Sequence, residues 1–114
     1  MRLPASRSQQ VWEAIDEMVR RIVERFQPQK IILFGSCARG EAGRDSDVDL
    51  LVVLPVEGPK RKKLLEIRSA LMGMGLPKDI LIATPEEVEL YRDVAGTIIE
   101  PALREGRVLY ERPA

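Results

Sequence analysis

The sequence predicts an α/β fold in which helices pack on a small mixed β-sheet. Three observations favour this fold class: several segments repeat apolar residues at helical spacing, short β-branched runs stand between them, and glycine or proline marks the boundaries. The chain has 114 residues, of which 45% are hydrophobic and 32% are charged. These values are typical of one folded domain, so we expect a single domain over residues 1–114.

The first predicted element is a long amphipathic helix. Apolar residues from Val11 to Phe26 follow one another at steps of three and four, which draws one stripe along a helix. Ser8 is the expected N-cap and Pro28 the expected stop. The β-branched run Lys30–Phe34 then predicts a buried strand, closed by the glycine that follows it.

Two further strands are expected on either side of a second helix. The strands are Asp47–Leu54 and Asp79–Ala83, and the helix runs from Lys60 to about Met72. The helix supplies a crossover connection. If the two strands are neighbours in the sheet, their first residues lie side by side.

The last third of the chain predicts two more helices and a final strand. Thr84–Glu87 has the pattern of a helix start, with a capping hydroxyl, a proline at the first helical position and a glutamate for the reciprocal cap. A further helix is expected from near Ala95 to Glu105, although it contains Pro101. Gly106 then ends it, and Arg107–Glu111 reads as a strand.

The composition excludes several classes of site. Eighteen basic residues balance eighteen acidic ones, so no overall field favours nucleic acid or an anionic membrane. The absence of histidine excludes Ser-His-Asp triads and histidine-rich zinc sites. The single cysteine, Cys37, cannot form an internal disulfide, and no apolar run approaches the roughly 20 residues of a bilayer span, so we expect a cytoplasmic protein. The remaining oxygen ligands favour magnesium or manganese.

The turn after the first strand is a candidate anion site. Gly35 and Ser36 follow the strand directly and open a short helix, whose first backbone N–H groups have no partner within the helix. Gly35 lets a ligand approach the backbone, and Ser36 adds a hydroxyl donor. A triphosphate suits this arrangement, although the same two residues also occur in ordinary turns.

Asp47 and Asp49 are two residues apart in a predicted strand. Their side chains therefore leave the same face at roughly 6–7 Å spacing, which is two rises of about 3.3 Å. The opposite face is apolar, and two like charges on such a strand repel unless a cation compensates them. The spacing suits a metal pair about 3.5–4 Å apart, as used in nucleotidyl transfer. The alternative is a solvated acidic turn at the start of the strand.

Asp79 opens the next predicted strand. Taken alone, a carboxylate in that position is more often a capping or solvated group than a ligand. If its strand neighbours the one that carries Asp47 and Asp49, Asp79 can hold one metal ion and help to deprotonate an attacking hydroxyl.

Together these residues resemble the signature of the polymerase-beta-type nucleotidyltransferase superfamily, and most closely its minimal nucleotidyltransferases. The shared pattern is Gly35-Ser36, then Asp47-Val48-Asp49 after ten intervening positions, with Arg39-Gly40 inside that interval and Asp79 downstream. The resemblance covers nearly the whole chain and implies a nucleotidyltransferase-like fold.

The resemblance also implies the roles of the site residues. Gly35 and Ser36 would bind the triphosphate of ATP or another NTP. Asp47 and Asp49 would ligate two Mg2+ ions, with Mn2+ as an alternative, and Asp79 would complete the catalytic and metal site.

Two basic features leave alternatives open. Arg39 matches a basic position of the motif, where it would bind phosphate or pair with a nearby acid such as Glu41 or Asp45. The run Lys60-Arg61-Lys62-Lys63 could dock phosphate, RNA or an acidic partner, but a solvated helix face is the simpler interpretation.

The resemblance further implies a biological setting. Many minimal nucleotidyltransferases are antitoxins paired with a HEPN-domain ribonuclease toxin, and active members transfer AMP from ATP to a tyrosine of that toxin. We therefore expect a HEPN toxin as partner, in a homo- or hetero-oligomer, and neither a membrane nor direct nucleic-acid binding. One alternative is a non-catalytic antitoxin or scaffold that neutralises its partner by binding alone. Another is nucleotidyl transfer to a small molecule or RNA.

Overall fold

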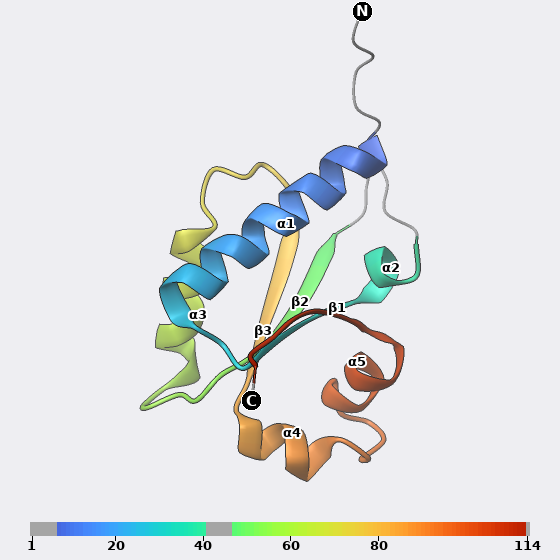
Figure 1. Cartoon of the computed structure of the whole chain (residues 1–114). Helices are drawn as coiled ribbons and strands as arrows, with labels where there is room; N and C mark the ends of the chain where they lie inside the picture. Colours follow the sequence, from blue (N-terminus) through green and yellow to red (C-terminus); the bar gives the residue numbers. More distant parts are fainter. Residues whose placement is uncertain (1–6, 41–46, 114) are drawn as a thin grey trace, which may run out of the picture.

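Four strands form one mixed sheet in the computed structural model, which describes residues 7–40 and 47–113. The strands are β1 (Lys30–Phe34), β2 (Val48–Val53), β3 (Lys78–Ala83) and β4 (Arg107–Glu111). Their order is β3-β2-β1-β4 (Figure 1). The β2 and β3 strands are parallel, whereas β1 is antiparallel to both β2 and β4. The small mixed sheet predicted from the sequence is therefore confirmed.

Five helices accompany the sheet in the described part of the chain. They are α1 (Arg7–Phe26), α2 (Gly35–Ala38), α3 (Lys60–Ala70), α4 (Pro85–Tyr91) and α5 (Ile99–Glu105). The α1 and α3 helices pack on one face of the sheet, and α4 and α5 pack on the other (Figure 1). Within the described ranges, no helix combines the length and the apolar composition that crossing a bilayer would need.

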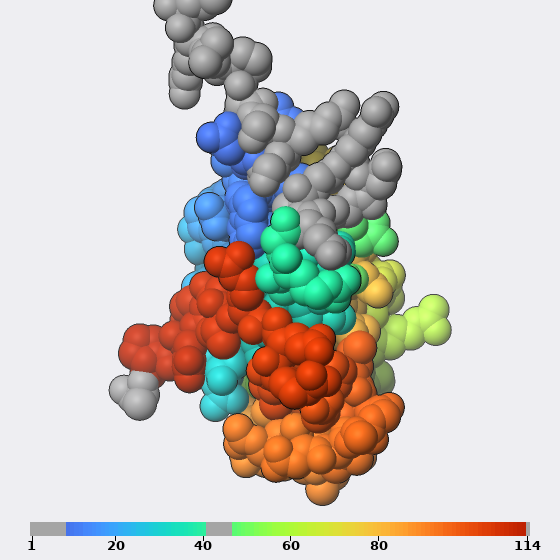
Figure 2. Space-filling view, turned by 90° about the vertical axis from the view of Figure 1, so that its right-hand side faces the viewer, coloured from blue at the N-terminus to red at the C-terminus, as the bar shows by residue number. Residues whose placement is uncertain are grey.

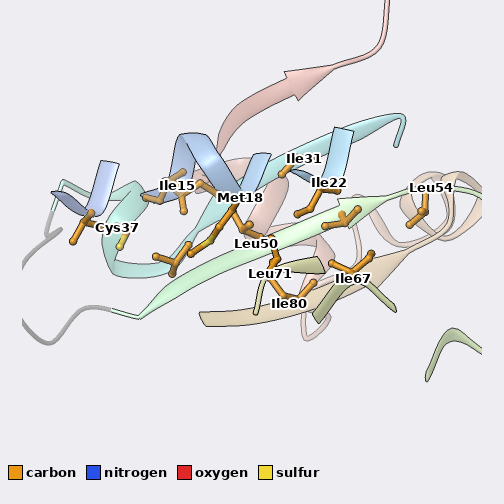
Figure 3. Close-up of a cluster of buried hydrophobic side chains, with 14 residues drawn as sticks. Ile15, Met18, Ile22, Ile31, Cys37, Leu50, Leu54, Ile67, Leu71 and Ile80 are labelled. Carbon is orange, nitrogen blue, oxygen red and sulfur yellow. The ribbon is translucent and has the colours of Figure 1, made fainter. Parts of the chain in front are cut away.

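Each face of the sheet buries its own apolar cluster. The larger cluster lies between the sheet, α1 and α3 (Figure 3), and the smaller one lies between the sheet and α4 and α5. The two clusters share β2 by alternation: Leu50 and Val52 belong to the larger, Leu51 and Val53 to the smaller. Asp49 therefore projects on the α4–α5 face of the sheet, opposite to Leu50 and Val52.

The starts of the first helix and of the second strand differ from the prediction. The first helix begins at Arg7, one residue before Ser8, so the prediction that Ser8 caps it is wrong. The second strand begins at Val48, where the backbone N–H donates to the Pro77 carbonyl at 3.0 Å, and Asp47 precedes it. A residue just before a strand makes no hydrogen bonds to the neighbouring strands. The alternation of polar and apolar residues does not show where those hydrogen bonds begin, so it could not place the start of the strand.

The first of the two helices after β3 begins as its capping chemistry requires, whereas the second begins later than expected. The Thr84 hydroxyl accepts a hydrogen bond from the Glu87 N–H at 3.1 Å, and the Glu87 carboxylate accepts one from the Thr84 N–H at 3.0 Å, which confirms the predicted capping box. The α5 helix begins at Ile99, four residues after the expected start near Ala95. Pro101 explains the shift, since a residue without an N–H is tolerated only in the first turn of a helix.

Candidate active site

The three predicted parts of the site meet at one edge of the sheet. Gly35 directly follows β1, and Asp49 and Asp79 are the second residues of β2 and β3. Because β1 is antiparallel to β2 and β3 is parallel to it, the end of β1 and the beginnings of β2 and β3 lie at the same edge. Asp49 is the register partner of Phe34 on one side and of Asp79 on the other.

Two other carboxylates, Asp79 and Asp47, act on Asp49 through their charge. Its side chain is half-buried, and Asp79 projects from the neighbouring strand on the same face of the sheet. Burial, then the negative charge of Asp79 and that of Asp47, raise the pKa of the Asp49 carboxyl above its ordinary value. A cation at this position would offset both the energetic cost of burying the Asp49 charge and its repulsion by the other two carboxylates.

Asp47 is exposed and lies just outside β2, where Cys37 holds its backbone. The Cys37 thiol donates a hydrogen bond to the Asp47 carbonyl, with the sulfur 3.3 Å from the oxygen. Cys37 is fully buried in the larger apolar cluster. Burial, followed by the charges of Asp49 and Asp47, raises the pKa of the Cys37 thiol. The thiol is therefore neutral, and it links α2 to the start of β2 as a packing residue.

Gly35 brings the backbone of α2 against Asp49. It has a φ of +74°, which favours glycine, and a Cβ at this position would overlap the Asp49 Oδ2 and lie 3.2 Å from its Cγ. The Arg39 N–H donates to the Gly35 and Ser36 carbonyls at 3.3 and 3.1 Å and closes the short helix. The missing side chain leaves the Asp49 carboxylate next to the backbone of the Gly-Ser turn.

The donor set at this edge fits a hard divalent cation. The three predicted ligands offer only carboxylate oxygens, which Mg2+ and Mn2+ prefer, and Gly35 leaves no side chain between the backbone and Asp49. Among residues 7–40 and 47–113, no three acidic or thiol side chains lie close enough together in this structure to hold a metal ion. Because like charges repel, we expect a bound cation to draw Asp47 and Asp79 inward toward Asp49. That three-way convergence stays a prediction.

Arg68 is a neighbour of the site that the sequence analysis missed. It projects from α3, and its Nη2 lies 4.0 Å from the Asp79 Oδ1. The two side chains are 52% and 61% exposed, so the pair contributes little to stability. Helical spacing places Arg68 on the exposed face of α3, but no local pattern shows that this face reaches the third carboxylate.

The hollow beside the Gly-Ser turn was also not predicted. It has a volume of about 170 Å3, and Gly35 and the exposed Arg39 form part of its wall. The remaining wall comes from the end of β1 and from α5 with the residue before it: Phe34, Ile98, Pro101, Ala102 and Glu105. Glu41 and Asp45, the acids considered as partners of Arg39, lie outside the described residues. A second hollow, of about 480 Å3, lies at the opposite edge of the sheet and touches none of the three acids.

Two residues of the basic run at the start of α3 contact side chains that do not belong to the candidate site. Lys60 forms an ion pair with Glu87 of the capping box, and Lys63 lies over the Phe26 ring, 5.6 Å from its centroid. These contacts favour a helix face over a docking site, although Lys60 and Lys63 contact other side chains and are not simply solvated as predicted.

A family model and two curated relatives match most of this chain. A family model described as "Nucleotidyltransferase domain" matches residues 15–104. A candidate protein adenylyltransferase of Methanocaldococcus jannaschii is 34% identical over 101 residues, which cover 86% of this chain and 96% of the relative. The protein adenylyltransferase MntA of Thermococcus cleftensis is 41% identical over 81 residues, which cover 70% and 77%.

Solved structures share the fold at lower identity. A candidate nucleotidyltransferase from Sulfolobus solfataricus superposes with a TM-score of 0.65 at 19% identity, over 98% of this chain and 93% of that one. A chain of a toxin–antitoxin complex with AMP-PNP gives 0.53 at 22% identity, over 88% and 73%. A chain of the toxin–antitoxin MntA-HpeT, with two Asp→Glu substitutions two positions apart, gives 0.54 at 18% identity, over 85% and 72%.

Proposed function

Because this chain belongs to the nucleotidyltransferase domain family, we propose that it transfers AMP from ATP to a tyrosine hydroxyl of a HEPN ribonuclease toxin and thereby acts as an antitoxin. It is a nucleotidyltransferase, and its two curated relatives are named as protein adenylyltransferases. Two structures of the same fold are toxin–antitoxin complexes, one of them with AMP-PNP. We assign the reaction to the cytoplasm, where ATP and a free thiol such as Cys37 occur together.

The observation that carries the proposal is the pairing of Asp49 with Asp79 beside Gly35. The two carboxylates are register partners on parallel strands, and the backbone at Gly35 approaches Asp49 closely enough to exclude a Cβ. Nucleotidyl transfer needs carboxylates next to a phosphate-binding turn, because the triphosphate must lie against both. Two acids with the same spacing as Asp47 and Asp49 were the ones substituted in the MntA-HpeT structure.

In the proposed mechanism the chain first binds and orients ATP. Backbone N–H groups of the Gly-Ser turn and the Ser36 hydroxyl donate hydrogen bonds to the triphosphate. Asp47, Asp49 and Asp79 would hold two Mg2+ ions, which when bound neutralise the charge that develops on the phosphates. Arg39, at the exposed end of α2, is proposed to bind a phosphate oxygen.

The transfer step is an in-line displacement at the α-phosphorus of ATP. The acceptor oxygen forms a bond to that phosphorus, the bond from the phosphorus to the bridging oxygen of the β-phosphate breaks, and pyrophosphate leaves with the bonding electrons. The hydroxyl proton passes to the Asp79 carboxylate. Asp79 is suited to this role because its side chain is 61% exposed and can be reached from solvent by an acceptor.

Radiolabel transfer tests the proposed function directly. We expect the chain, Mg2+, ATP labelled at the α-phosphate and the product of the adjacent gene to give a labelled partner, with the label on tyrosine. An Asp47→Asn variant is expected to give no label. If the partner is neutralised without any label, binding alone is the function. Label on RNA or a small molecule in place of the partner would contradict the proposed acceptor.

An Asp79→Asn variant is expected to separate turnover from nucleotide binding. Loss of a positioned proton acceptor lowers kcat by roughly 10²- to 10⁴-fold, whereas the Kd for ATP should change only a few-fold. The matched control is Arg68→Gln, which removes the ion-pair partner of Asp79 but keeps the carboxylate. Steady-state kinetics and equilibrium ATP binding measure the two effects, and equal losses in both would contradict the role of Asp79.

A further inference from the structure

One stretch of the surface exposes an unusual number of large apolar side chains. Of the seven that are exposed in the described part of the chain, four fall within nine residues. They are Leu90 (65% exposed), Tyr91 (36%), Val94 (45%) and Ile98 (48%), and we call them the α4–α5 surface. Single exposed apolar residues are normal, but a cluster of four is typical of an interaction site.

The α4–α5 surface extends from the candidate active site toward the opposite edge of the sheet, where α4 lines the 480 Å3 hollow. Ile98 lines the same 170 Å3 hollow as Gly35 and Arg39. Figure 2 shows α2 (teal), α5 (orange-red) and α4 (orange) one below another on a single face of the molecule. A protein that covers this face from α4 to α2 would contact both the apolar side chains and the Gly-Ser turn.

Backbone and side-chain hydrogen bonds hold this surface in shape. The Val94 N–H donates to the Tyr91 carbonyl at 3.1 Å, and the Thr97 hydroxyl donates to the Val94 carbonyl at 2.8 Å. The same hydroxyl accepts from the Glu100 N–H at 3.3 Å, which joins the turn to the start of α5. The apolar side chains are thus presented before any partner binds, which lowers the entropy that binding loses.

Negative charge borders the α4–α5 surface. Residues 85–105 contain six acidic and two basic side chains, whereas the whole chain is neutral. Glu86 and Glu89 share a shallow hollow with Leu90, and Glu105 shares the site hollow with Ile98. Arg92 pairs with Glu89 and Arg104 pairs with Glu105, and the segment keeps a net negative charge. The complementary surface is therefore apolar at its centre and bordered by lysine and arginine.

We propose that the acceptor protein docks on the α4–α5 surface through an apolar patch bordered by basic side chains, and thereby brings its hydroxyl to the edge that carries Asp79. This inference rests on the proposed function, because it names where the acceptor of that reaction binds. A second copy of this chain is a poorer occupant, since a symmetric contact would set the acidic borders against each other. Nucleic acid is disfavoured by the same charge.

Two charge-introducing variants, Leu90→Glu and Val94→Glu, test the docking site singly and together. The control is Met72→Glu, which adds the same charge at a 73% exposed apolar residue just after α3, on the opposite face of the sheet. The probe is the product of the adjacent gene. We expect the double variant to raise the KM for this protein, and its Kd by calorimetry, at least tenfold, with ATP affinity and melting temperature unchanged. Met72→Glu should change each value less than twofold.

The border charges provide an independent arm. A Glu86→Lys, Glu89→Lys variant is expected to weaken acceptor binding several-fold at low salt and less at high salt, because exposed charges are screened. Unchanged acceptor affinity in the Leu90→Glu, Val94→Glu double variant would overturn the docking site even where label transfer is normal. A wild-type dimer that these substitutions dissociate would assign the surface to a second copy and would also overturn it. Weakened acceptor binding with no label transfer in the wild type would sustain the docking site and refute the proposed function.

Discussion

An Asp49→Asn variant is expected to lose adenylyl transfer by about 10³-fold or more. Asparagine keeps the size of the side chain but removes the charge that lies between Asp47 and Asp79. Carboxylate-held cations contribute several kcal/mol to such transfers, and each 1.4 kcal/mol is a factor of ten in rate. The rate of label transfer at saturating ATP measures the loss, and activity within tenfold of the wild type would contradict a central role for Asp49.

The same variant is expected to be at least as stable as the wild type without metal. Burial and the charges of Asp79 and Asp47 raise the pKa of Asp49 above 3.8 in the folded state. Between 3.8 and that raised value the folded state holds more protons than the unfolded state, so stability falls as pH rises through this window. Asp49→Asn removes this loss.

Thermal melts between pH 3 and pH 8, in a chelating buffer, test the stability prediction. The difference in melting temperature between the variant and the wild type should grow in favour of the variant as pH rises from 3.8, and then level off. A variant that melts several degrees below the wild type at neutral pH would show that the Asp49 carboxylate stabilises the fold.

A Gly35→Ala variant is expected to lose both activity and stability. The residue has a φ of +74°, and a Cβ would overlap the Asp49 carboxylate. Backbone strain of this kind costs about 1–3 kcal/mol, and moving Asp49 aside should lower transfer by roughly 10²-fold, which is about 2.7 kcal/mol in the transition state.

Gly40→Ala is the matched control for this substitution. Gly40 follows the same short helix and has a φ of +82°, but a Cβ there meets no atom of residues 7–40 and 47–113 within 4 Å. The two variants share the strain of the left-handed backbone, so the difference between them isolates the collision with Asp49. Denaturant unfolding and label transfer measure that difference. Equal activity in both variants would contradict the claim that the collision with Asp49 at Gly35 lowers activity.

The sequence predicted those features that depend on local chemistry. The capping box at Thr84 follows from three side chains in one turn, and the face on which Asp49 projects follows from alternation along β2. The prediction that Asp49 and Asp79 lie side by side depended on their strands being neighbours in the sheet. The parallel pairing of β2 and β3 across the α3 crossover meets that condition.

Features that arise from tertiary packing could not be predicted. The α5 wall of the hollow depends on how closely α5 approaches β1, which Gly106 permits: a Cβ there would lie 2.6 Å from the Ile32 Cγ2 and 2.9 Å from the Leu33 carbonyl. Arg68 reaches Asp79 only because α3 packs beside β3. An isolated aromatic such as Tyr91 is usually buried, so its exposure on the α4–α5 surface had no signal in the sequence.

Mn2+ uptake in the presence of AMP-PNP is the decisive measurement for the metal site, because electron paramagnetic resonance counts bound manganese without requiring turnover. We predict nucleotide-dependent binding of about two ions per chain, with loss of at least one ion in Asp49→Asn and weaker binding in Asp79→Asn. Arg68→Gln should bind as the wild type does. Absence of nucleotide-dependent uptake, or uptake that is unchanged in Asp49→Asn, would contradict the claim that these carboxylates form the metal site of a nucleotidyltransferase.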